Sequence, residues 1–280
     1  MMGRQPMNIG ILNIMHDKID TKKRFDSVLK AAKQSLKITY FYPTMHYRGR
    51  EVPEYLLKFA EPLALDKVSK MDAFIVTGAP LERLDFNEVT YWKELKELFA
   101  FLKKNEMPQL YICWGAMAAA NYFYGIDKKM LVEKIFGVYQ HKISGTCLLL
   151  EGLKSGFKAP HARYADLNKD QILSSDMLKI NALSMNGELF LMEARTQPQT
   201  FLFAHLEYGK DALTKEYQRE AAAYPEKAAS LAKPQNYYLN ENKMTGELFS
   251  WANTQKVFFE NWLKRIYCQK RNLDIDKLSF

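Results

Sequence analysis

The sequence predicts an α/β fold in which a mostly parallel sheet carries helices on both faces. Short apolar segments of strand length alternate with longer segments whose apolar residues recur every three or four positions. The strand-like segments end at proline, glycine or other turn-forming residues. The chain has 280 residues, of which 48% are hydrophobic, so it can bury a substantial core in one or two domains.

The first half of the chain carries the clearest pattern. Phe25, Val28, Leu29 and Ala32 follow an apolar run at the spacing of one helix face. The predicted elements are, in order, a strand at 7–15, a helix around 21–32, strands at 36–42 and 73–76, a helix at 89–102, a strand at 110–113 and a helix at 116–124. In a sheet of this kind, active-site residues gather at the carboxyl ends of the strands.

The second half predicts a continuation of the same fold with a carboxyl-terminal elaboration. Its predicted elements are strands at 146–150, 180–183, 189–192 and 200–204, a helix at 211–223, a loop at 233–242 and a last helix at about 255–267. We expect one domain over 1–280, with a core at about 7–225 and an extension at about 226–280 that packs back on it.

Composition narrows the function classes. Lysine and arginine total 40 against 32 acidic residues, a formal net charge of +8. The basic residues are spread along the chain, which usually means a solvated surface, but the excess would also favour a polyanionic ligand such as a nucleotide or coenzyme A. Because no basic recognition motif with interleaved aromatic residues is present, we expect no nucleic-acid partner.

The length of the apolar runs and the spacing of the cysteines indicate the cellular compartment. No apolar run reaches the ~18 residues that span a bilayer, and the start, Met1 to Pro6, has no cleavage site. We therefore expect a cytoplasmic protein without membrane contact. Cys113, Cys147 and Cys268 lie far apart with no C-x-x-C pairing, so neither a disulfide framework nor a metal site is predicted.

Cys113 is the first candidate catalytic residue. It follows the predicted strand and directly precedes a helix rich in small residues, which is the geometry of a nucleophile elbow. A helix amino terminus stabilises a thiolate and offers backbone N–H groups to a developing oxyanion. The alternative is a buried structural thiol.

His205 and Glu207 are the second and third candidates. They close the predicted strand at 200–204, where strand alternation would put both side chains on one face. The histidine could act as a general base, and the carboxylate could hold its ring and stabilise the imidazolium. Alone, this pair is a weak signal, because an isolated histidine beside an acid is more often a surface residue than a catalyst. With Cys113 it predicts a Cys-His-Glu triad.

A long resemblance adds to this prediction. The matching segments are 11–21, V-T-G-A-P at 76–80, Tyr91-Trp92, I-C-W-G at 112–115, E-K-I-F-G-V at 133–138, A-P-H-A-R-Y-A-D at 159–166, H-L-E-Y at 205–208 and Asn261-Trp262-Leu263. In this order they resemble the homoserine O-acyltransferases of methionine biosynthesis, relatives of class I glutamine amidotransferases. The resemblance implies a flavodoxin-like fold of the class I glutamine amidotransferase type.

The resemblance also implies ping-pong acyl transfer. Cys113 would attack the thioester of an acyl-CoA and pass the acyl group to the side-chain hydroxyl of an amino acid, with His205 as general base and Glu207 as its orienting partner. The implied co-substrate is acetyl-CoA, with no permanently bound cofactor. The implied partners are small-molecule substrates, with a possible homodimer.

Substrate residues follow from the same resemblance. Lys134, Arg219 and Lys18 match substrate-binding positions of the family, and a guanidinium fork suits an amino-acid carboxylate. For the two lysines the alternative is surface solvation. Glu82 matches a position where glutamate accompanies acetyl-CoA and glycine accompanies succinyl-CoA, because a carboxylate repels the succinyl carboxylate. It could also cap the segment that follows.

Departures from the family leave the acceptor open. Ala162 stands where the family has a serine, Leu206 and Gly209 replace proline and aspartate, Thr254 falls near an expected histidine, and the amino-terminal segment is shorter. We expect homoserine or serine as acceptor, and serine would place the enzyme in cysteine rather than methionine supply. We expect substrate contacts from Asn13 and Tyr164.

Two other functions stay open. An amide hydrolase of the glutamine amidotransferase type would use a similar elbow, although Tyr111 occupies the first glycine position of its G-x-C-x-G pattern. An inactive relative that binds coenzyme A or a nucleotide is the other alternative. No catalytic role is assigned to His16, His46, His141 or His161.

Overall fold

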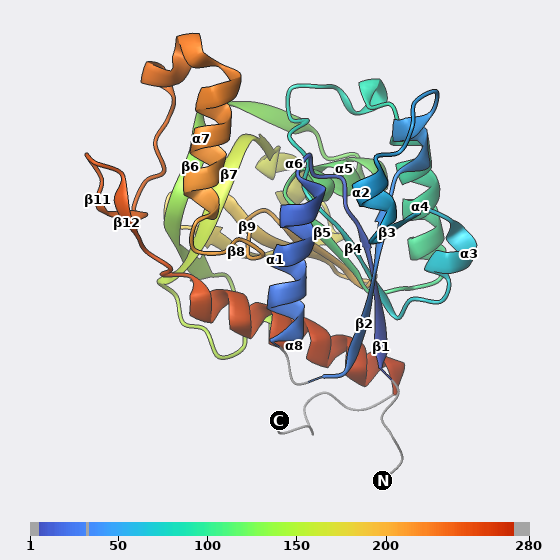
Figure 1. Ribbon diagram of the computed structural model, residues 1–280. Coiled ribbons are helices and arrows are strands. Elements are labelled where there is room, and N and C mark those ends of the chain that lie inside the picture. The colour runs from blue at the N-terminus through green and yellow to red at the C-terminus, as the bar shows by residue number, and fades with distance from the viewer. Residues whose placement is uncertain (1–5, 32–33, 272–280) are drawn as a thin grey trace.

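A ten-stranded mixed sheet runs through the computed structural model, which describes residues 6–31 and 34–271 (Figure 1). Six neighbouring strands are parallel and the other four run antiparallel. In sheet order the strands are β3 (Ala60–Pro62), β2 (Leu36–Tyr42), β1 (Met7–Leu12), β4 (Ala73–Val76), β5 (Gln109–Ile112), β10 (Gln199–Leu202), β9 (Leu189–Ala194), β8 (Leu178–Ser184), β6 (Lys128–Ile143) and β7 (Phe157–Leu167).

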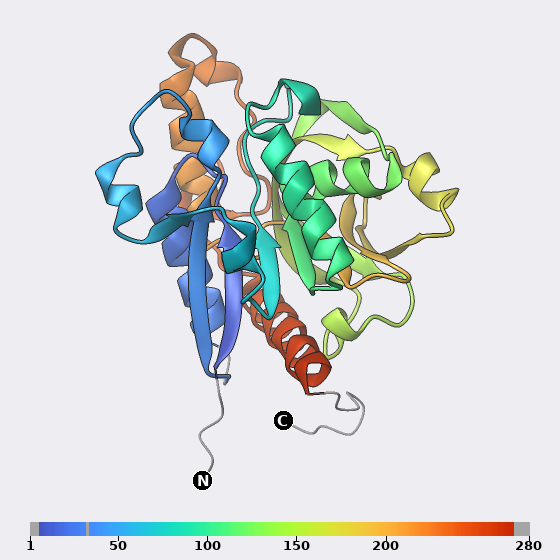
Figure 2. The same cartoon turned by 90° about the vertical axis from the view of Figure 1, so that its right-hand side faces the viewer.

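Helices cover both faces of this sheet, as predicted (Figures 1 and 2). They are α1 (Lys18–Lys30), α2 (Glu54–Leu57), α3 (Leu65–Val68), α4 (Trp92–Lys104), α5 (Trp114–Tyr124), α6 (Lys169–Leu173), α7 (Ala212–Ala223) and α8 (Ala252–Lys270). Because strand side chains alternate between faces, Ile9 and Ile11 join the core under α1 and α8, whereas Phe74 and Val76 join the core under α4 and α5.

The predictions for the first half of the chain agree with the structure. The segments 36–42 and 73–76 are strands with those bounds. The first helix begins earlier than the apolar spacing indicates, because the Asp17 carboxylate caps it by accepting the Asp20 N–H at 2.9 Å. Ala32 and the segment 1–5, which were also part of the sequence interpretation, lie outside the described residues.

The predicted strand at 146–150 is wrong. Leu148–Leu150 forms a short 3₁₀ helix that packs on α8. Leu149 and Leu150 are both buried, and the Asn261 side-chain amide donates to the Leu149 carbonyl at 3.3 Å. The backbone of this apolar run therefore finds a hydrogen-bond donor on α8 instead of on a neighbouring strand.

Several strands were not predicted. β6 and β7 form a long antiparallel hairpin in which Lys128–Ile143 lacks a clean alternation, because both faces of its first half are largely exposed. The predicted loop at 233–242 contains the strand β11 (Tyr238–Asn240), which pairs with β12 (Thr245–Glu247) in a separate two-stranded sheet.

The last helix, α8, crosses the lower side of the molecule in Figure 1 and packs on α1 and the sheet. Its buried residues Phe258, Trp262, Leu263 and Ile266 belong to the same core cluster as Phe25 of α1. Within residues 6–31 and 34–271, no helix combines the length and the hydropathy that a bilayer crossing requires.

Candidate active site

Cys113 forms a sharp turn at the edge of the sheet where the parallel strands end. β5 stops at Ile112 and α5 begins at Trp114, so the cysteine alone connects them. Its φ of 49° and ψ of −114° are rare for a residue with a side chain and are tolerated where surrounding contacts enforce them. The Cys113 N–H donates to the Leu202 carbonyl at 2.8 Å, which ties the turn to β10. The strand-to-helix turn expected here is present.

Two glycines let the loop after β4 approach this turn. A Cβ on Gly115 would lie 2.6 Å from the Thr77 carbonyl oxygen. A Cβ on Gly78 would lie 3.3 Å from the Cys113 Cβ and 3.5 Å from the His205 Cε1. Close packing therefore excludes a side chain at Gly115 and leaves little room for one at Gly78. Gly78 keeps open the space beside the thiol and the imidazole.

His205 connects Cys113 to Glu207. The His205 Nδ1 lies 2.8 Å from the Glu207 Oε1, and the ring also hydrogen-bonds the Cys113 side chain. Because the carboxylate occupies Nδ1, the nitrogen that faces the sulfur is Nε2. Burial lowers the pKa of His205, but the sulfur and the carboxylate outweigh burial and raise that pKa well above 6.5. The structure thus brings the three predicted residues into one buried chain.

The contact between His205 and Glu207 arises from a turn and not from strand alternation. β10 ends at Leu202, and the Tyr208 N–H donates to the His205 carbonyl at 3.0 Å, which closes a turn over these residues. The expectation that both side chains lie on one strand face is wrong, because these residues form a turn after the strand has ended. The turn is formed because the chain leaves the sheet at Phe203 to reach α7.

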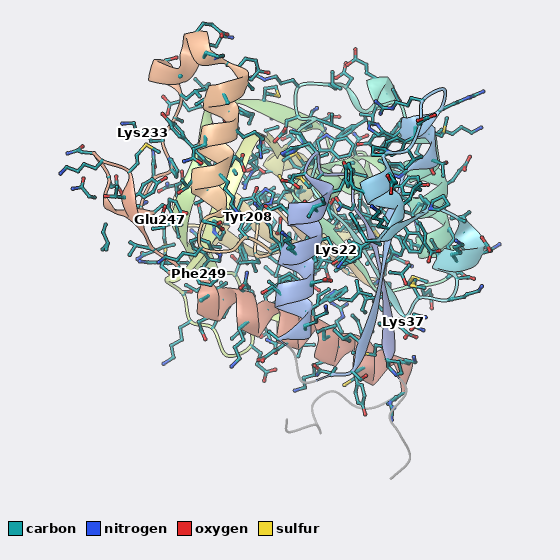
Figure 3. All side chains as sticks on the ribbon, in the orientation of Figure 1. Lys22, Lys37, Tyr208, Lys233, Glu247 and Phe249 are labelled. Carbon is teal, nitrogen blue, oxygen red and sulfur yellow. The ribbon has the colours of Figure 1, made fainter. Side chains whose placement is uncertain are left out.

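Tyr208 supports the imidazole from the side. Its ring stacks on the His205 ring at 4.4 Å between centroids, and its hydroxyl donates to the Glu216 Oε2 at 2.8 Å. The guanidinium carbon of Arg24 lies 4.5 Å from the centroid of the Tyr208 ring, so Tyr208 is held between α1 and α7 (Figure 3). These contacts restrict the orientation of the His205 ring.

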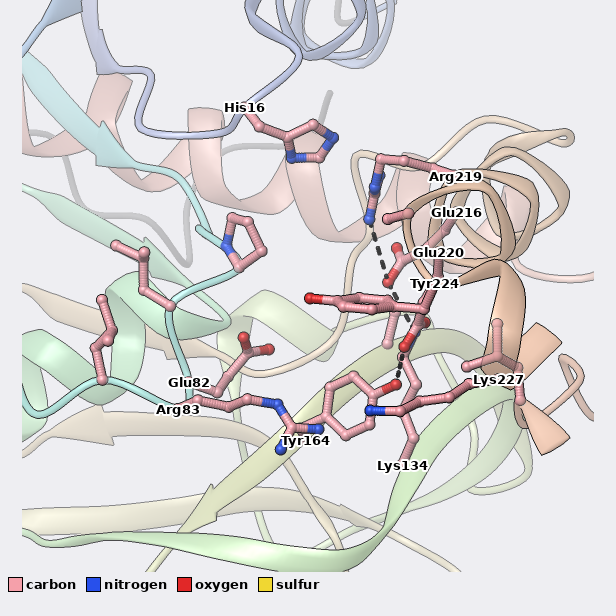
Figure 4. A pocket seen from close by; sticks show the side chains of 16 residues that line it. His16, Glu82, Arg83, Lys134, Tyr164, Glu216, Arg219, Glu220, Tyr224 and Lys227 are labelled. Atoms are coloured by element: carbon pink, nitrogen blue, oxygen red, sulfur yellow. Dashed lines mark hydrogen bonds and ion pairs between the residues drawn. The ribbon is translucent and has the colours of Figure 1, made fainter.

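A cavity of about 660 Å³ adjoins the hydrogen-bonded row of Cys113, His205 and Glu207. It is lined by the loop 80–84, by residues of β6 and β7, by α7 and by the segment after α7 (Figure 4). Five residues predicted to contact substrate line it, namely Glu82, Lys134, Ala162, Tyr164 and Arg219. Cys113 and His205 do not line it themselves, but Gly78, which adjoins both, leads into the loop 80–84.

Two of the cations that line this cavity, Lys134 and Arg219, differ in how closely carboxylates neutralise them. The buried Lys134 ammonium lies 3.2 Å from Glu216 and 2.7 Å from Glu220. Arg219 is more exposed, and its nearest carboxylate, on Glu216, is 3.8 Å away. Burial opposes ionisation of Glu216, but Lys134 and Arg219 outweigh it and lower the pKa of Glu216 below 4.5. Of the two cations, Arg219 is the better placed to receive a substrate carboxylate.

Glu82 lies in the same electrostatic environment. Burial, together with the nearby Glu216 carboxylate, raises the pKa of Glu82 above its usual 4.5, whereas His205 and Lys134 act in the opposite direction. The side chain enters the cavity from the loop after β4 (Figure 4). Glu82 is thus within electrostatic range of the His205 imidazole.

The sequence interpretation missed Glu216 and Glu220. Glu220 accepts hydrogen bonds from Lys134 and from the Tyr164 hydroxyl, and Tyr164 itself lines the cavity, as expected of a substrate contact. The spacing of residues 216, 219 and 220 on a predicted helix places their side chains on one face. With Arg219 singled out, this spacing was the signal that could have identified both glutamates.

Lys18 and Asn13 lie outside this cavity and bind each other. The Lys18 ammonium donates to the Asn13 carbonyl at 2.8 Å, and the Asn13 side-chain amide donates to the Lys18 carbonyl at 3.0 Å. Both residues are buried, and burial lowers the pKa of Lys18 to about 8. The structure therefore does not place these two predicted substrate residues beside Glu82, Lys134 and Arg219.

The other histidines fall into two groups. His16 lines the cavity and His46 packs edge-on against Tyr91, whereas His141 and His161 are fully buried. Among the residues that the structure describes, no three histidine, cysteine, aspartate or glutamate side chains are grouped as a metal site would require.

Comparison with known proteins assigns the chain to a protein family. A family model described as homoserine O-succinyltransferase matches residues 3–272. The chain belongs to the homoserine O-succinyltransferase family. Among its relatives, the serine O-acetyltransferase of Lactobacillus acidophilus is 49% identical over 93% of this chain and 95% of its own length. That of Lacticaseibacillus casei is 43% identical, over 95% and 97%.

A third relative is the homoserine O-acetyltransferase of Campylobacter jejuni (strain RM1221), 38% identical over 92% of this chain and 85% of its own length. Together these matches confirm that the chain is an acyltransferase. Solved structures agree on the fold. A glutamine amidotransferase from Thermotoga maritima superposes with a TM-score of 0.60 and 13% identity, over 94% of this chain and 99% of its own.

The departures from the homoserine O-succinyltransferase family now have structural positions. Ala162 lines the cavity, so the hydroxyl of the family's serine is missing from the cavity wall of this protein. Leu206 is buried, and the Gln255 side-chain amide, next to Thr254 on α8, donates to the Leu206 carbonyl at 2.5 Å. A Cβ on Gly209 would meet only Asp211, at 3.7 Å. Among Ala162, Leu206, Gly209 and Thr254, Ala162 alone lines the cavity.

Proposed function

We propose that this protein transfers an acetyl group from acetyl-CoA to the side-chain hydroxyl of serine or homoserine through an acetylated Cys113. The observation that carries the proposal is the buried chain in which Cys113 hydrogen-bonds His205 and His205 hydrogen-bonds Glu207 at 2.8 Å. A sulfur, an imidazole and a carboxylate in this order provide a nucleophile, a proton carrier and an orienting group.

In the first half-reaction, the Cys113 sulfur attacks the thioester carbonyl carbon of acetyl-CoA. A new carbon–sulfur bond forms, the carbon–sulfur bond to coenzyme A breaks, and His205 gives its proton to the departing sulfur. The first N–H groups of α5, which follow Cys113 directly, have no helical acceptor and would donate to the developing oxyanion. The product is acetyl-Cys113 and free coenzyme A.

In the second half-reaction, the acceptor hydroxyl attacks the acetyl carbonyl. His205 takes the hydroxyl proton, the new ester bond forms, and the Cys113 thiolate leaves. Glu207 keeps the proton on Nδ1, so that Nε2 remains free to exchange the reacting proton in both directions. The same three residues therefore serve both halves of the cycle.

Acceptor binding is assigned to the cavity. The α-carboxylate of the amino acid pairs with Arg219, the cation with the more distant carboxylate partner. Glu220 and Glu216, which hold Lys134, provide the negative charge that an α-ammonium group requires. We propose serine as the preferred acceptor, because the relatives at 49% and 43% identity carry that name.

We further propose that the whole chain, 1–280, acts as one cytoplasmic unit of amino-acid biosynthesis with small-molecule substrates and no permanent cofactor, and that it can pair as a homodimer. The chain-long match at residues 3–272 supports a single functional unit. Sedimentation of the purified protein tests the oligomer.

Crossed kinetics test the function. Release of free thiol is measured with acetyl-CoA and succinyl-CoA, each with serine and homoserine. We expect acetyl-CoA with serine to give the highest kcat/KM. Mass spectrometry after mixing with acetyl-CoA alone should show one acetyl group on Cys113. Ammonia release from glutamine without coenzyme A release would contradict the proposal and favour an amide hydrolase.

Donor choice is tested at Glu82. In Glu82→Gly the carboxylate that repels a succinyl group is removed, so kcat/KM for succinyl-CoA should rise at least about tenfold relative to acetyl-CoA. Glu226→Gly, on the exposed segment after α7, is the matched control and should leave the donor ratio unchanged. An unaltered ratio in Glu82→Gly would refute the assignment.

A further inference from the structure

Arg163 of β7 is a fully buried cation close to the catalytic chain. Its guanidinium donates to the Phe203 carbonyl at 3.1 Å, to the Leu189 carbonyl at 3.0 Å and to the Asp166 carboxylate at 3.1 Å. It also contacts the His161 Nδ1. This one side chain therefore hydrogen-bonds three segments: the one after β10, the first residue of β9, and its own strand β7.

The segment after β10 is where the chain leaves the sheet and carries His205. The Phe203 N–H donates to the Phe190 carbonyl at 2.8 Å, and the His205 N–H donates to the Pro160 carbonyl at 2.9 Å. The Phe203 carbonyl faces Arg163. Because β10 has ended at Leu202, these contacts with β7 and β9 replace the regular ladder and set where the histidine lies.

We propose that Arg163 is a positioning residue for His205, which fixes the Phe203 carbonyl so that the imidazole meets the Cys113 sulfur. The proposal rests on the proposed function only through the pairing of Cys113 with His205. A buried ion pair is weak support for stability, because apolar residues of similar volume often serve as well. Its geometric value is that a planar fork can hold two carbonyls and a carboxylate at once.

Arg163 also fixes the protonation of its neighbours. A guanidinium can only donate, so the His161 Nδ1 must accept, and the His161 proton must sit on Nε2. That Nε2 lies 2.8 Å from the His141 Nε2, which must then accept in turn. Burial and the Arg163 charge both lower the pKa of His161, which agrees with this neutral pair. No histidinium therefore competes with His205 for the Cys113 charge.

The ionisable groups that face His205 come from several elements. They are Cys113 before α5, Glu207 and the stacked Tyr208 in its own turn, His161 of β7, Glu82 of the loop after β4 and Glu216 of α7. Arg163→Lys leaves the Cys113 sulfur and the three carboxylates chemically unchanged and keeps a positive charge beside His161, whose Nδ1 the guanidinium contacts. A shift in the proton behaviour of the Cys113 and His205 pair would then report displacement of the histidine.

Arg163→Lys tests the proposal in the full chain. A lysine keeps the charge but cannot hold both carbonyls and the carboxylate. We expect kcat to fall about 10- to 100-fold while KM for each substrate stays within about twofold. The rate of Cys113 alkylation by iodoacetamide, measured against pH, should reach half its maximum about one pH unit higher. This second measurement does not depend on the acyl donor or the acceptor, so it remains informative if the proposed function fails.

His141→Asn is the matched control. It removes another buried member of the same polar chain, which packs between Phe157 and Phe190 but does not touch the Phe203 carbonyl. It should lower thermal stability and leave the alkylation midpoint unchanged. A folded Arg163→Lys with the wild-type kcat and midpoint would overturn the proposal. So would failure of both Arg163→Lys and Asp166→Asn to fold, because the guanidinium would then serve the fold rather than the histidine.

Discussion

At Cys113 the backbone conformation and the side-chain chemistry depend on each other. The positive φ turns the sulfur away from β5 toward His205, and the bond from the Cys113 N–H to the Leu202 carbonyl holds that conformation. A residue in a rare backbone region costs about 1–3 kcal/mol, so surrounding contacts must enforce it. The contacts with Gly78 and His205 are the local evidence for such enforcement.

Removing the sulfur or the imidazole should stop transfer in different ways. Cys113→Ala should lower kcat by at least about 1,000-fold because no acyl-enzyme can form. His205→Asn should slow both half-reactions by about 100- to 10,000-fold, since proton transfer is lost in each. Rapid-mixing measurements of coenzyme A release and of ester formation separate the two steps. Cys147→Ala, at a buried thiol far along the chain, is the control and should retain activity.

Lys18 makes stability depend on pH. Burial lowers its folded pKa from 10.5 to about 8. Between these values the unfolded chain holds a proton that the folded chain has released, so stability rises with pH over this window. Relative to Lys18→Met, the wild-type unfolding free energy should gain about 3 kcal/mol in total between pH 8 and 10.5. Urea unfolding at several pH values measures it, and a constant difference would contradict the pKa shift.

At the scale of elements, α5 sits on the end of β4 at contact distance. A Cβ on Gly115 would lie 2.6 Å from the Thr77 carbonyl oxygen and 3.0 Å from that of Val76. Both obstacles are backbone atoms, which cannot rotate away. The helix that follows Cys113 can therefore lie where it does only with glycine in its first turn.

Gly115→Ala should force α5 away from β4. We expect a loss of about 1–3 kcal/mol of stability from overpacking, together with a large loss of activity because Cys113 moves with the helix. Urea unfolding and thiol-release kinetics measure the two effects. Gly209→Ala is the matched control, since its Cβ would meet only Asp211 at 3.7 Å. Wild-type activity in Gly115→Ala would show that the elbow tolerates movement.

Elements also show where sequence patterns succeed. The helix predicted at 89–102 and observed at Trp92–Lys104 was predictable because burial of one face enforces a period that the sequence displays. The strand 73–76 is buried on both faces, and it was predictable as a short apolar run that ends at turn residues. β6 was not, since its exposed first half needs no apolar alternation. The 3₁₀ helix at Leu148–Leu150 was mistaken for a strand because apolar runs of that length do not reveal whether a strand or a helix covers them.

At the scale of the whole molecule, α8 joins the end of the described chain to its beginning. It packs against α1, and its Gln255 side-chain amide donates to the carbonyls of Leu206 and Tyr208 beside His205. The catalytic turn is therefore supported by a helix about 50 residues further along the sequence. Stability and the shape of the site are coupled through this helix.

Trp262→Ala should test that coupling. The indole is almost fully buried between α1 and the sheet, so its loss should cost about 3–5 kcal/mol. Lys256→Ala, on the exposed side of α8, should change stability by no more than about 0.5 kcal/mol. Chemical unfolding of both variants gives the comparison. Equal stabilities would mean that α8 is only loosely attached.

The sequence by itself determined the α/β class, the turn at Cys113 and the nearness of His205 to Glu207, because these depend on short-range periodicity and on residues two or three positions apart. Only the tertiary structure decided that Lys134 is neutralised by Glu216 and Glu220, that Lys18 binds Asn13 instead of the cavity, and that Arg163 reaches the Phe203 carbonyl. The Lys134 and Arg163 contacts join elements whose relative placement is set by packing of the whole core, which no local pattern encodes. The Lys18 contact spans only five residues, but burial of both residues in the folded core decides that the ammonium binds the Asn13 carbonyl.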